Sequence, residues 1–222
     1  MHIPDGFLDP KVWGAASGVS AGFTGYALYV VRQKLNEKLI PMLGITAAFI
    51  FAAQMLNFPV AGGTSGHFLG ATLACILLGA WPGFLVMVIV LLVQCLFFAD
   101  GGLAALGANI LNMGIVGGIF SHLIFSYIKS NLQRLIGQRK GILTSAAIAS
   151  WLSVVLASIA CSIELALAGT VPLSVAFPAM TSIHMLIGIG EAIITTVVLA
   201  VVMQARPDLV HALSGMTATS KA

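Results

Sequence analysis

The sequence predicts an all-α protein, a polytopic transmembrane helical bundle of about seven spans with its N-terminus outside and its C-terminus in the cytoplasm. Three observations lead to this fold class: 59% of the 222 residues are hydrophobic, only 8% are charged, and the basic residues gather in a few short segments. Soluble domains carry about 25% charged residues, and the mean hydropathy of this chain is +1.05. A water-soluble fold is therefore excluded, and a lipid bilayer is the expected environment.

Helices rather than strands are expected to cross the membrane. A spanning helix needs about 20 mainly apolar residues, whereas the strands of a membrane barrel alternate polar and apolar residues, and residues 84–99 show no alternation. The predicted spans are residues 13–31, 40–56, 67–80, 82–99, 107–128, 142–168 and 178–203. We expect an extracellular N-terminal segment 1–12, a helical bundle over 13–206 and a cytoplasmic tail over 207–222.

The ten basic residues set the orientation, because cytoplasmic loops collect Lys and Arg. All except Lys11 lie between spans one and two, between spans five and six, or after span seven: Arg32, Lys34, Lys38, Lys129, Arg134, Arg139, Lys140, Arg206 and Lys221. These segments share one side of the membrane, which we assign to the cytoplasm of a multi-pass protein in the cytoplasmic membrane. The net charge of +3 reflects this bias and indicates no nucleic-acid partner.

The first residues do not look like a signal peptide. Residues 1–8 carry no basic region, and no apolar run precedes Trp13, so nothing marks the segment for removal. Methionine is removed efficiently only before small residues, and His2 is bulky. We therefore expect Met1 to remain, with a free α-amine.

A histidine at position two of a free N-terminus has a specific metal chemistry. The Met1 α-amine, the His2 amide nitrogen and His2 Nδ1 can bind one metal in fused five- and six-membered rings. Displacing the amide proton requires a metal that gains strongly from planar nitrogen ligands, which favours Cu(II) or Ni(II), with Co(II) less favourable. A fourth planar position stays open. The alternative is that His2 is an ordinary surface histidine.

His67 is the candidate for the fourth ligand, because it follows a Gly-rich outward loop at the start of a predicted span. A helix-capping or interfacial histidine is the alternative. Asn57, Thr64 and Ser65 are close enough in sequence to orient the His67 ring by accepting its second ring proton. Asp5 could help to offset positive charge. Loop solvation and helix capping explain these four polar residues equally well.

Two carboxylates and a histidine inside the last two predicted spans need an account, because a charge in the membrane is costly. They are Glu164 in span six and His184 and Glu191 in span seven. Two interpretations compete: a buried polar cluster that holds the bundle together, or a release pathway for a cation. Small residues also recur at four-residue spacing at Gly14, Gly18 and Gly22 and at Gly114 and Gly118, which favours close helix packing. These faces could pack inside the bundle, which is the commoner case and the one expected here, or against a partner subunit.

Three motifs then resemble one known family. They are Met-His-Ile-Pro-Asp-Gly-Phe-Leu at 1–8, Gly-Thr-Ser-Gly-His-Phe-Leu-Gly at 63–70 and Ile-His-Met-Leu-Ile-Gly-Ile-Gly-Glu-Ala at 183–192. They look like the CbiM/NikM family, the substrate-capturing S components of energy-coupling-factor (ECF) importers for nickel and cobalt. The resemblance implies a metal site formed by Met1, His2 and His67, with Ni(II) or Co(II) as the transported substrate and no organic cofactor. It also implies a transmembrane coupling (T) subunit, two cytoplasmic ATPases and, in some systems, a small accessory membrane subunit.

Other functions remain open on the residues alone. An intramembrane metalloenzyme needs a ligand set with an open position and a general base, and the sequence contains no HExxH motif. No GxxxxGK[ST] motif occurs either, so we expect a transport component that is not an enzyme, with ATP hydrolysis on partner subunits. A stand-alone secondary metal transporter or channel, and a vitamin-binding component of the same importer class, are the remaining alternatives.

Overall fold

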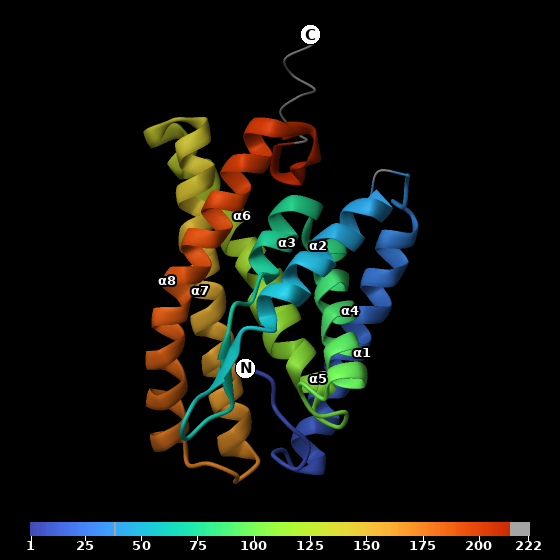
Figure 1. The fold of residues 1–222 in the computed structure, drawn as a ribbon, viewed down its shortest axis with the longest axis vertical. Helices are drawn as coiled ribbons and strands as arrows, with labels where there is room; N and C mark the ends of the chain where they lie inside the picture. Colours follow the sequence, from blue (N-terminus) through green and yellow to red (C-terminus); the bar gives the residue numbers. More distant parts are fainter. Residues whose placement is uncertain (38, 214–222) are drawn as a thin grey trace.

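The computed structural model describes residues 1–37 and 39–213, and the chain over these residues is mostly helical (Figure 1). The elements in chain order are α1 (Pro10–Arg32), α2 (Leu39–Gln54), β1 (Asn57–Pro59), β2 (Ser65–His67), α3 (Ala71–Leu78), α4 (Ala80–Phe98), α5 (Leu106–Asn109), η1 (Ile110–Phe120), α6 (Ser121–Ile136), α7 (Gln138–Leu167), α8 (Leu173–Ala205), η2 (Pro207–Leu209) and η3 (His211–Leu213). The helices α5, η1 and α6 are continuous, and η1 is wound as a π-helix.

Among the described residues, four helices are long and apolar enough to cross a membrane. They are α4, the continuous helix Leu106–Ile136, α7 and α8, and they coincide with the predicted spans at 82–99, 107–128, 142–168 and 178–203. Helix α2 is apolar but has only 16 residues, and α1 has 23 residues. The polytopic helical character predicted from the sequence is therefore confirmed for these four helices.

The predicted third span, residues 67–80, is wrong as a spanning helix. Its helical part, α3, has eight residues, all buried, and extends only about 12 Å at 1.5 Å per residue. Gly70 (φ 75°) precedes α3 and Gly79 (φ 94°) ends it, both in backbone conformations that favour glycine. A short helix packed on all sides is as apolar as a membrane span, which explains the error.

A small antiparallel sheet precedes α3 and departs from the expected all-α fold. Strands β1 and β2 pair in the register Asn57↔His67, Phe58↔Gly66 and Pro59↔Ser65. The turn between them is closed by hydrogen bonds between Val60 and Thr64 and between Gly63 and Val60. The hairpin carries His67 into the bundle interior, where 1% of its surface is exposed.

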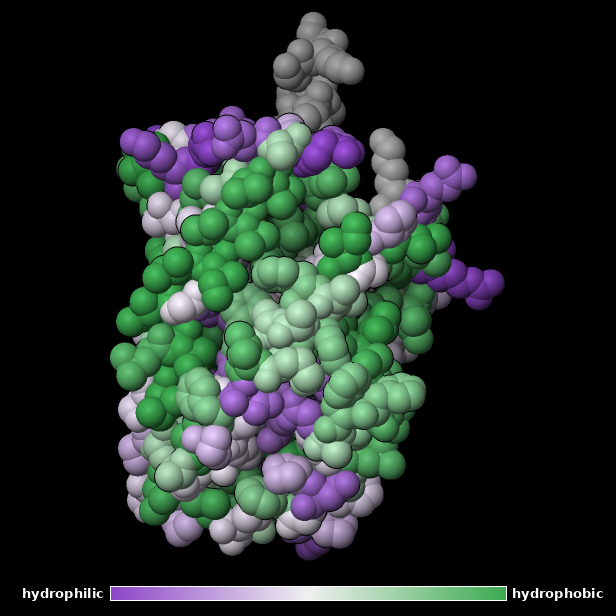
Figure 2. Space-filling view, in the orientation of Figure 1, coloured by the Kyte–Doolittle hydropathy of each residue, from purple (hydrophilic) through white to green (hydrophobic). Residues whose placement is uncertain are grey.

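The two ends of the bundle differ. Figure 1 places the α1–α2 turn, the α6–α7 turn and the end of α8 at one end, and the N-terminal segment, the α4–α5 connection and the α7–α8 turn at the other. Figure 2 shows a largely hydrophobic surface between these ends. The basic residues of the described turns thus gather at one end, as the sequence predicts, whereas Lys38 and Lys221 lie outside the described residues.

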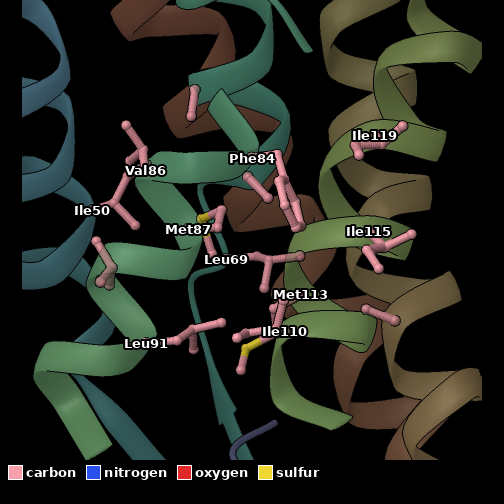
Figure 3. Packing of buried hydrophobic residues seen from close by; sticks show 14 of the residues in the cluster. Ile50, Leu69, Phe84, Val86, Met87, Leu91, Ile110, Met113, Ile115 and Ile119 are labelled. Atoms are coloured by element: carbon pink, nitrogen blue, oxygen red, sulfur yellow. The ribbon is translucent and has the colours of Figure 1, made fainter. Parts of the chain in front are cut away.

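The core beside the hairpin is built from α2, α4 and η1. Ile50, Phe84, Met87 and Met113 belong to this core (Figure 3) and are fully buried. Gly114 packs inside as predicted, since a Cβ at that position would lie 2.9 Å from the Phe84 ring.

The glycine stripe of α1 faces away from the rest of the bundle. A Cβ added at Gly14, Gly18 or Gly22 would meet no described heavy atom within 4 Å. The expected internal packing of this stripe is therefore wrong. A four-residue spacing places small residues on one helix face, but it does not say which neighbour that face meets.

Candidate metal site

The N-terminal segment is folded into the bundle between the hairpin and the α4–α5 connection. Met1 and Ile3 are fully buried, and His2 is 4% exposed. Asn109 holds Ile3 on both sides, because its side-chain oxygen accepts from the Ile3 N–H at 2.8 Å and its amide donates to the Ile3 carbonyl at 3.2 Å. Gly102 N–H also donates to that carbonyl at 2.9 Å. Three hydrogen bonds to the Ile3 backbone thus fix the chain end inside the bundle.

Ser65 holds the α-amine of Met1. The amine donates to the Ser65 carbonyl at 2.5 Å and to Ser65 Oγ at 2.8 Å, and the His2 N–H donates to the same Oγ at 3.1 Å. Burial lowers the pKa of the Met1 amine from its ordinary value of 8.0 to about 5, because desolvation disfavours the charged form. At neutral pH the amine therefore has a lone pair available.

The rings of His2 and His67 stack, with their centroids 4.5 Å apart and an interplanar angle of 23°. His67 Nδ1 lies 2.7 Å from the Phe68 carbonyl oxygen, which requires the proton on Nδ1 and leaves a lone pair on Nε2. His67 Nε2 is buried and has no hydrogen-bond partner within the described part of the chain. Burial and the nearby chain terminus lower the pKa of His67 well below its ordinary value, so this ring is neutral.

His2 is held from the other side. Its Nε2 lies 3.1 Å from Gln94 Oε1, so Nε2 carries the proton and Nδ1 the lone pair. Burial, followed by the charge of the chain terminus, lowers the pKa of His2 to about 3. The Nδ1 atom lies 3.3 Å from a carboxylate oxygen of Asp100, and Asn57 donates to the other oxygen of Asp100 at 3.1 Å.

The structure brings Met1, His2, Ser65 and His67 together and places the other predicted residues around them. The acceptor for the His67 ring proton is the Phe68 carbonyl rather than Asn57, Thr64 or Ser65. Asn57 contacts Asp100, and Thr64 contacts the sulfur atoms of Cys161 and Met180. Asp5 accepts hydrogen bonds from the backbone of Leu103 and Ala104, so it anchors the N-terminal segment.

Sequence reasoning missed Gln94, Asp100 and Asn109, which hold the N-terminal segment. Their signal is that Gln94 and Asn109 are polar residues inside apolar helices, a placement that is costly and often functional. Over the described residues, no group of three or more His, Cys, Asp or Glu side chains is placed to bind a metal.

The titratable residues inside the helices do not form one cluster. Glu164 accepts from Asn112 at 2.6 Å, and His184 Nδ1 lies 2.7 Å from the Met180 carbonyl oxygen on its own helix. Glu191 instead accepts from the backbone of the segment that follows His67.

Comparisons with known proteins find similar chains among metal transport proteins. The NikMN protein of Archaeoglobus fulgidus, which bears the name of a fused nickel transport protein, is 42% identical over 95% of this chain and 68% of its own length. The fused nickel transport protein NikMN of Rhodobacter capsulatus is 33% identical over 94% of this chain, which spans 63% of that protein. A crystal structure of a truncated transition metal transporter aligns with a TM-score of 0.82 and 32% identity over 92% of this chain and 99% of its own.

The family assignment rests on nearly the whole chain. Residues 2–209 match the model of the family described as "CbiM: Cobalt uptake substrate-specific transmembrane region". The apolar spanning helices fit a membrane protein that takes part in nickel or cobalt transport. The chain belongs to the CbiM family.

Proposed function

We propose that this chain is the substrate-specific (S) component of an ECF-type importer, and that it binds Ni(II) or Co(II) through a free N-terminus for ATP-driven uptake. One observation carries the proposal: the buried Met1 amine, the stacked His2 and His67 rings and the shared Ser65 anchor meet at one point, although 64 residues of chain separate Met1 from Ser65. Outside a binding site, burying a chain terminus is costly.

The ligands are four nitrogen atoms. The Met1 amine, the ionised His2 amide and His2 Nδ1 form a planar three-nitrogen chelate, and His67 Nε2 closes the fourth position. The tautomers set by Gln94 and by the Phe68 carbonyl leave lone pairs on His2 Nδ1 and His67 Nε2. Since the amine and imidazoles are neutral before the metal arrives, only the His2 amide must lose a proton. This requirement favours Ni(II) over metals that bind oxygen ligands.

Energy for uptake is expected from partner proteins: a T subunit, two cytoplasmic ATPases and, in some systems, a small accessory membrane subunit. The absence of a GxxxxGK[ST] motif in the sequence supports this division of labour. The gathering of basic residues at the end of the bundle opposite the N-terminal segment supports a site that opens to the outside of the cytoplasmic membrane.

The proposal is tested by blocking the chain end. Purified protein with one residue added before Met1, and the variant His2→Ala, should no longer retain nickel in a one-to-one ratio, whereas His122→Ala, which changes a histidine outside the site, should retain it. Mass spectrometry verifies that Met1 is present and unmodified in the unaltered protein. Bound nickel should be yellow and diamagnetic, as planar coordination requires. If the extended protein and His2→Ala both retain nickel in a one-to-one ratio, the proposal is wrong.

Reconstituted vesicles test the coupling. Nickel uptake should require the T subunit and ATPases. Uptake by the chain alone would instead support a secondary transporter or channel.

A further inference from the structure

Glu191 of α8 binds the backbone next to His67. Its two carboxylate oxygens accept hydrogen bonds from the N–H groups of Leu69 and Gly70, each at 2.7 Å. Both oxygens act as acceptors, which is the arrangement of an ionised carboxylate, and only 1% of the residue is exposed. A buried charge costs several kcal/mol unless hydrogen bonds and nearby charges compensate it. Holding the Leu69–Gly70 backbone with a buried carboxylate is therefore energetically costly.

The rest of the segment that carries His67 is held by the same helix. Thr64 N–H lies 3.4 Å from Met180 Sδ, and the Gly66 backbone packs against Ile187, because a Cβ at Gly66 would lie 2.7 Å from Ile187 Cδ1. Met180, Ile187 and Glu191 are spaced by seven and four residues, so they share one face of α8. The segment thus contacts α8 in order along its length.

The chain end is held from two sides. His2 contacts Gln94 of α4, and Ile3 contacts Asn109 of α5. The Met1 amine and the His2 N–H are also held by Ser65, which lies in the same strand as His67. The position of the segment that carries His67 therefore affects all four proposed ligands, and α8 contacts that segment.

We propose that Glu191 is a positioning residue for the metal: it holds the backbone of Leu69 and Gly70 so that His67 Nε2 occupies the fourth coordination position. This inference rests on the proposed function. It links α8 to the fourth ligand.

The variant Glu191→Gln tests the inference. A Gln side chain offers one acceptor oxygen and one NH2 donor, so one backbone N–H loses its partner and faces a donor. Nickel affinity should fall by about 10- to 100-fold, the usual effect of removing a group that orients a metal ligand. The ligand-field spectrum of bound nickel should also shift toward that of His67→Ala. Glu191→Asp keeps the charge but is one methylene shorter, so it should be intermediate.

Glu164→Gln is the matched control. Glu164 is a buried carboxylate of α7 that accepts from Asn112, and within the described part of the chain no hydrogen bond or ion pair joins it to residues 63–70. The same change there should leave both the affinity and the spectrum of bound nickel unaltered. An equal spectral shift in Glu164→Gln would overturn the inference, because a general loss of stability would then explain both.

A double-mutant cycle separates positioning from other roles. If Glu191 acts through His67, adding Glu191→Gln to His67→Ala should weaken nickel binding no further. An undiminished effect in the His67→Ala background overturns the inference. If Glu191→Gln does not fold, as judged by gel filtration, the same cycle is run with Glu191→Asp. Loss of retention on His2→Ala reports on the proposed function separately, so the two ideas can fail independently.

Discussion

At the scale of single residues, the candidate site depends on groups that burial keeps neutral. An exposed Met1 amine would be largely protonated at pH 7, and a metal would have to displace that proton. Here burial has already removed it. The free energy needed to desolvate and deprotonate the amine is therefore part of folding, so it does not reduce the free energy of metal binding.

This neutrality predicts the pH dependence of nickel binding. Between about pH 6 and pH 8 the affinity should rise about tenfold per pH unit, because only the His2 amide still has a proton to lose. Below about pH 5 the dependence should steepen to about a hundredfold per unit, because the Met1 amine, with a pKa of about 5, then becomes protonated. Titration against a competing chelator at a series of pH values measures both slopes.

A peptide of residues 1–8 is the control for this titration. Its exposed amine and imidazole titrate near 8.0 and 6.5, so its nickel affinity should depend more steeply on pH throughout that range. A protein affinity that is constant from pH 6 to pH 8 would show that the amide keeps its proton.

Asn109 supplies a second prediction. Its side chain pairs with both the N–H and the carbonyl of Ile3, and unpaired buried groups cost about 1–3 kcal/mol. Asn109→Ala should therefore weaken nickel binding by about 10- to 100-fold, as isothermal titration calorimetry can measure. Asn112→Ala is the control, because this nearby buried residue pairs with Glu164. Equal losses in the two variants would assign the effect to the bundle rather than to the seating of the chain end.

Met1 and His2 could be proposed as ligands from the sequence because the chelating chemistry of a position-two histidine is local. His67 could be proposed because it follows a Gly-rich outward loop and lies in a motif that resembles the family. Gln94, Asp100 and Asn109 could not be predicted in the same way. Each meets the N-terminal segment across about 90 or more residues of chain, and no local pattern indicates that approach. Assigning the His67 ring-proton acceptor needed coordinates for a similar reason: the acceptor is a backbone carbonyl, which every residue type has.

At the scale of elements, long apolar runs predicted helices well and short ones less well. The runs around α4, α7 and α8 exceed the length that a buried core helix usually has, so their assignment was secure. Residues 67–80 fall in the range where a core helix and a span look alike. In the structure, Gly70 and Gly79 lie at the two ends of α3, and His67, the first residue of this range, belongs to strand β2.

A comparison of Gly18, which lies on the outward face of α1, with Gly107 of α5, which packs against α1, gives the third prediction. Gly18→Ala should leave the protein as stable or raise its stability by about 0.5–1 kcal/mol, because the new Cβ meets nothing within 4 Å and alanine favours helix. Gly107→Ala of α5 should lower stability by about 1–3 kcal/mol, because its Cβ would overlap Ser17 of α1. Thermal unfolding in detergent compares them. Similar destabilisation by both changes would contradict the outward placement of the α1 stripe.

At the scale of the whole molecule, a largely hydrophobic surface separates the two ends of the bundle (Figure 2). Large apolar side chains such as Leu186, Ile193 and Val201 are exposed along α8, where lipid can cover them. Except for Lys11, the described basic residues gather at the end opposite the N-terminal segment. The cytoplasmic preference of Lys and Arg then supports the proposal that the candidate site faces the outside.

This orientation gives the last prediction. In a variant whose three cysteines, Cys75, Cys95 and Cys161, are replaced by alanine, Ala61→Cys marks the hairpin turn and Arg139→Cys marks the α6–α7 turn, both at exposed positions. A membrane-impermeant maleimide should label the first in intact cells and the second only after permeabilisation, since the reagent reaches only the outer face. One-to-one nickel retention verifies that each variant is folded. The reverse labelling pattern would place the chain end in the cytoplasm, where it could not capture metal for import.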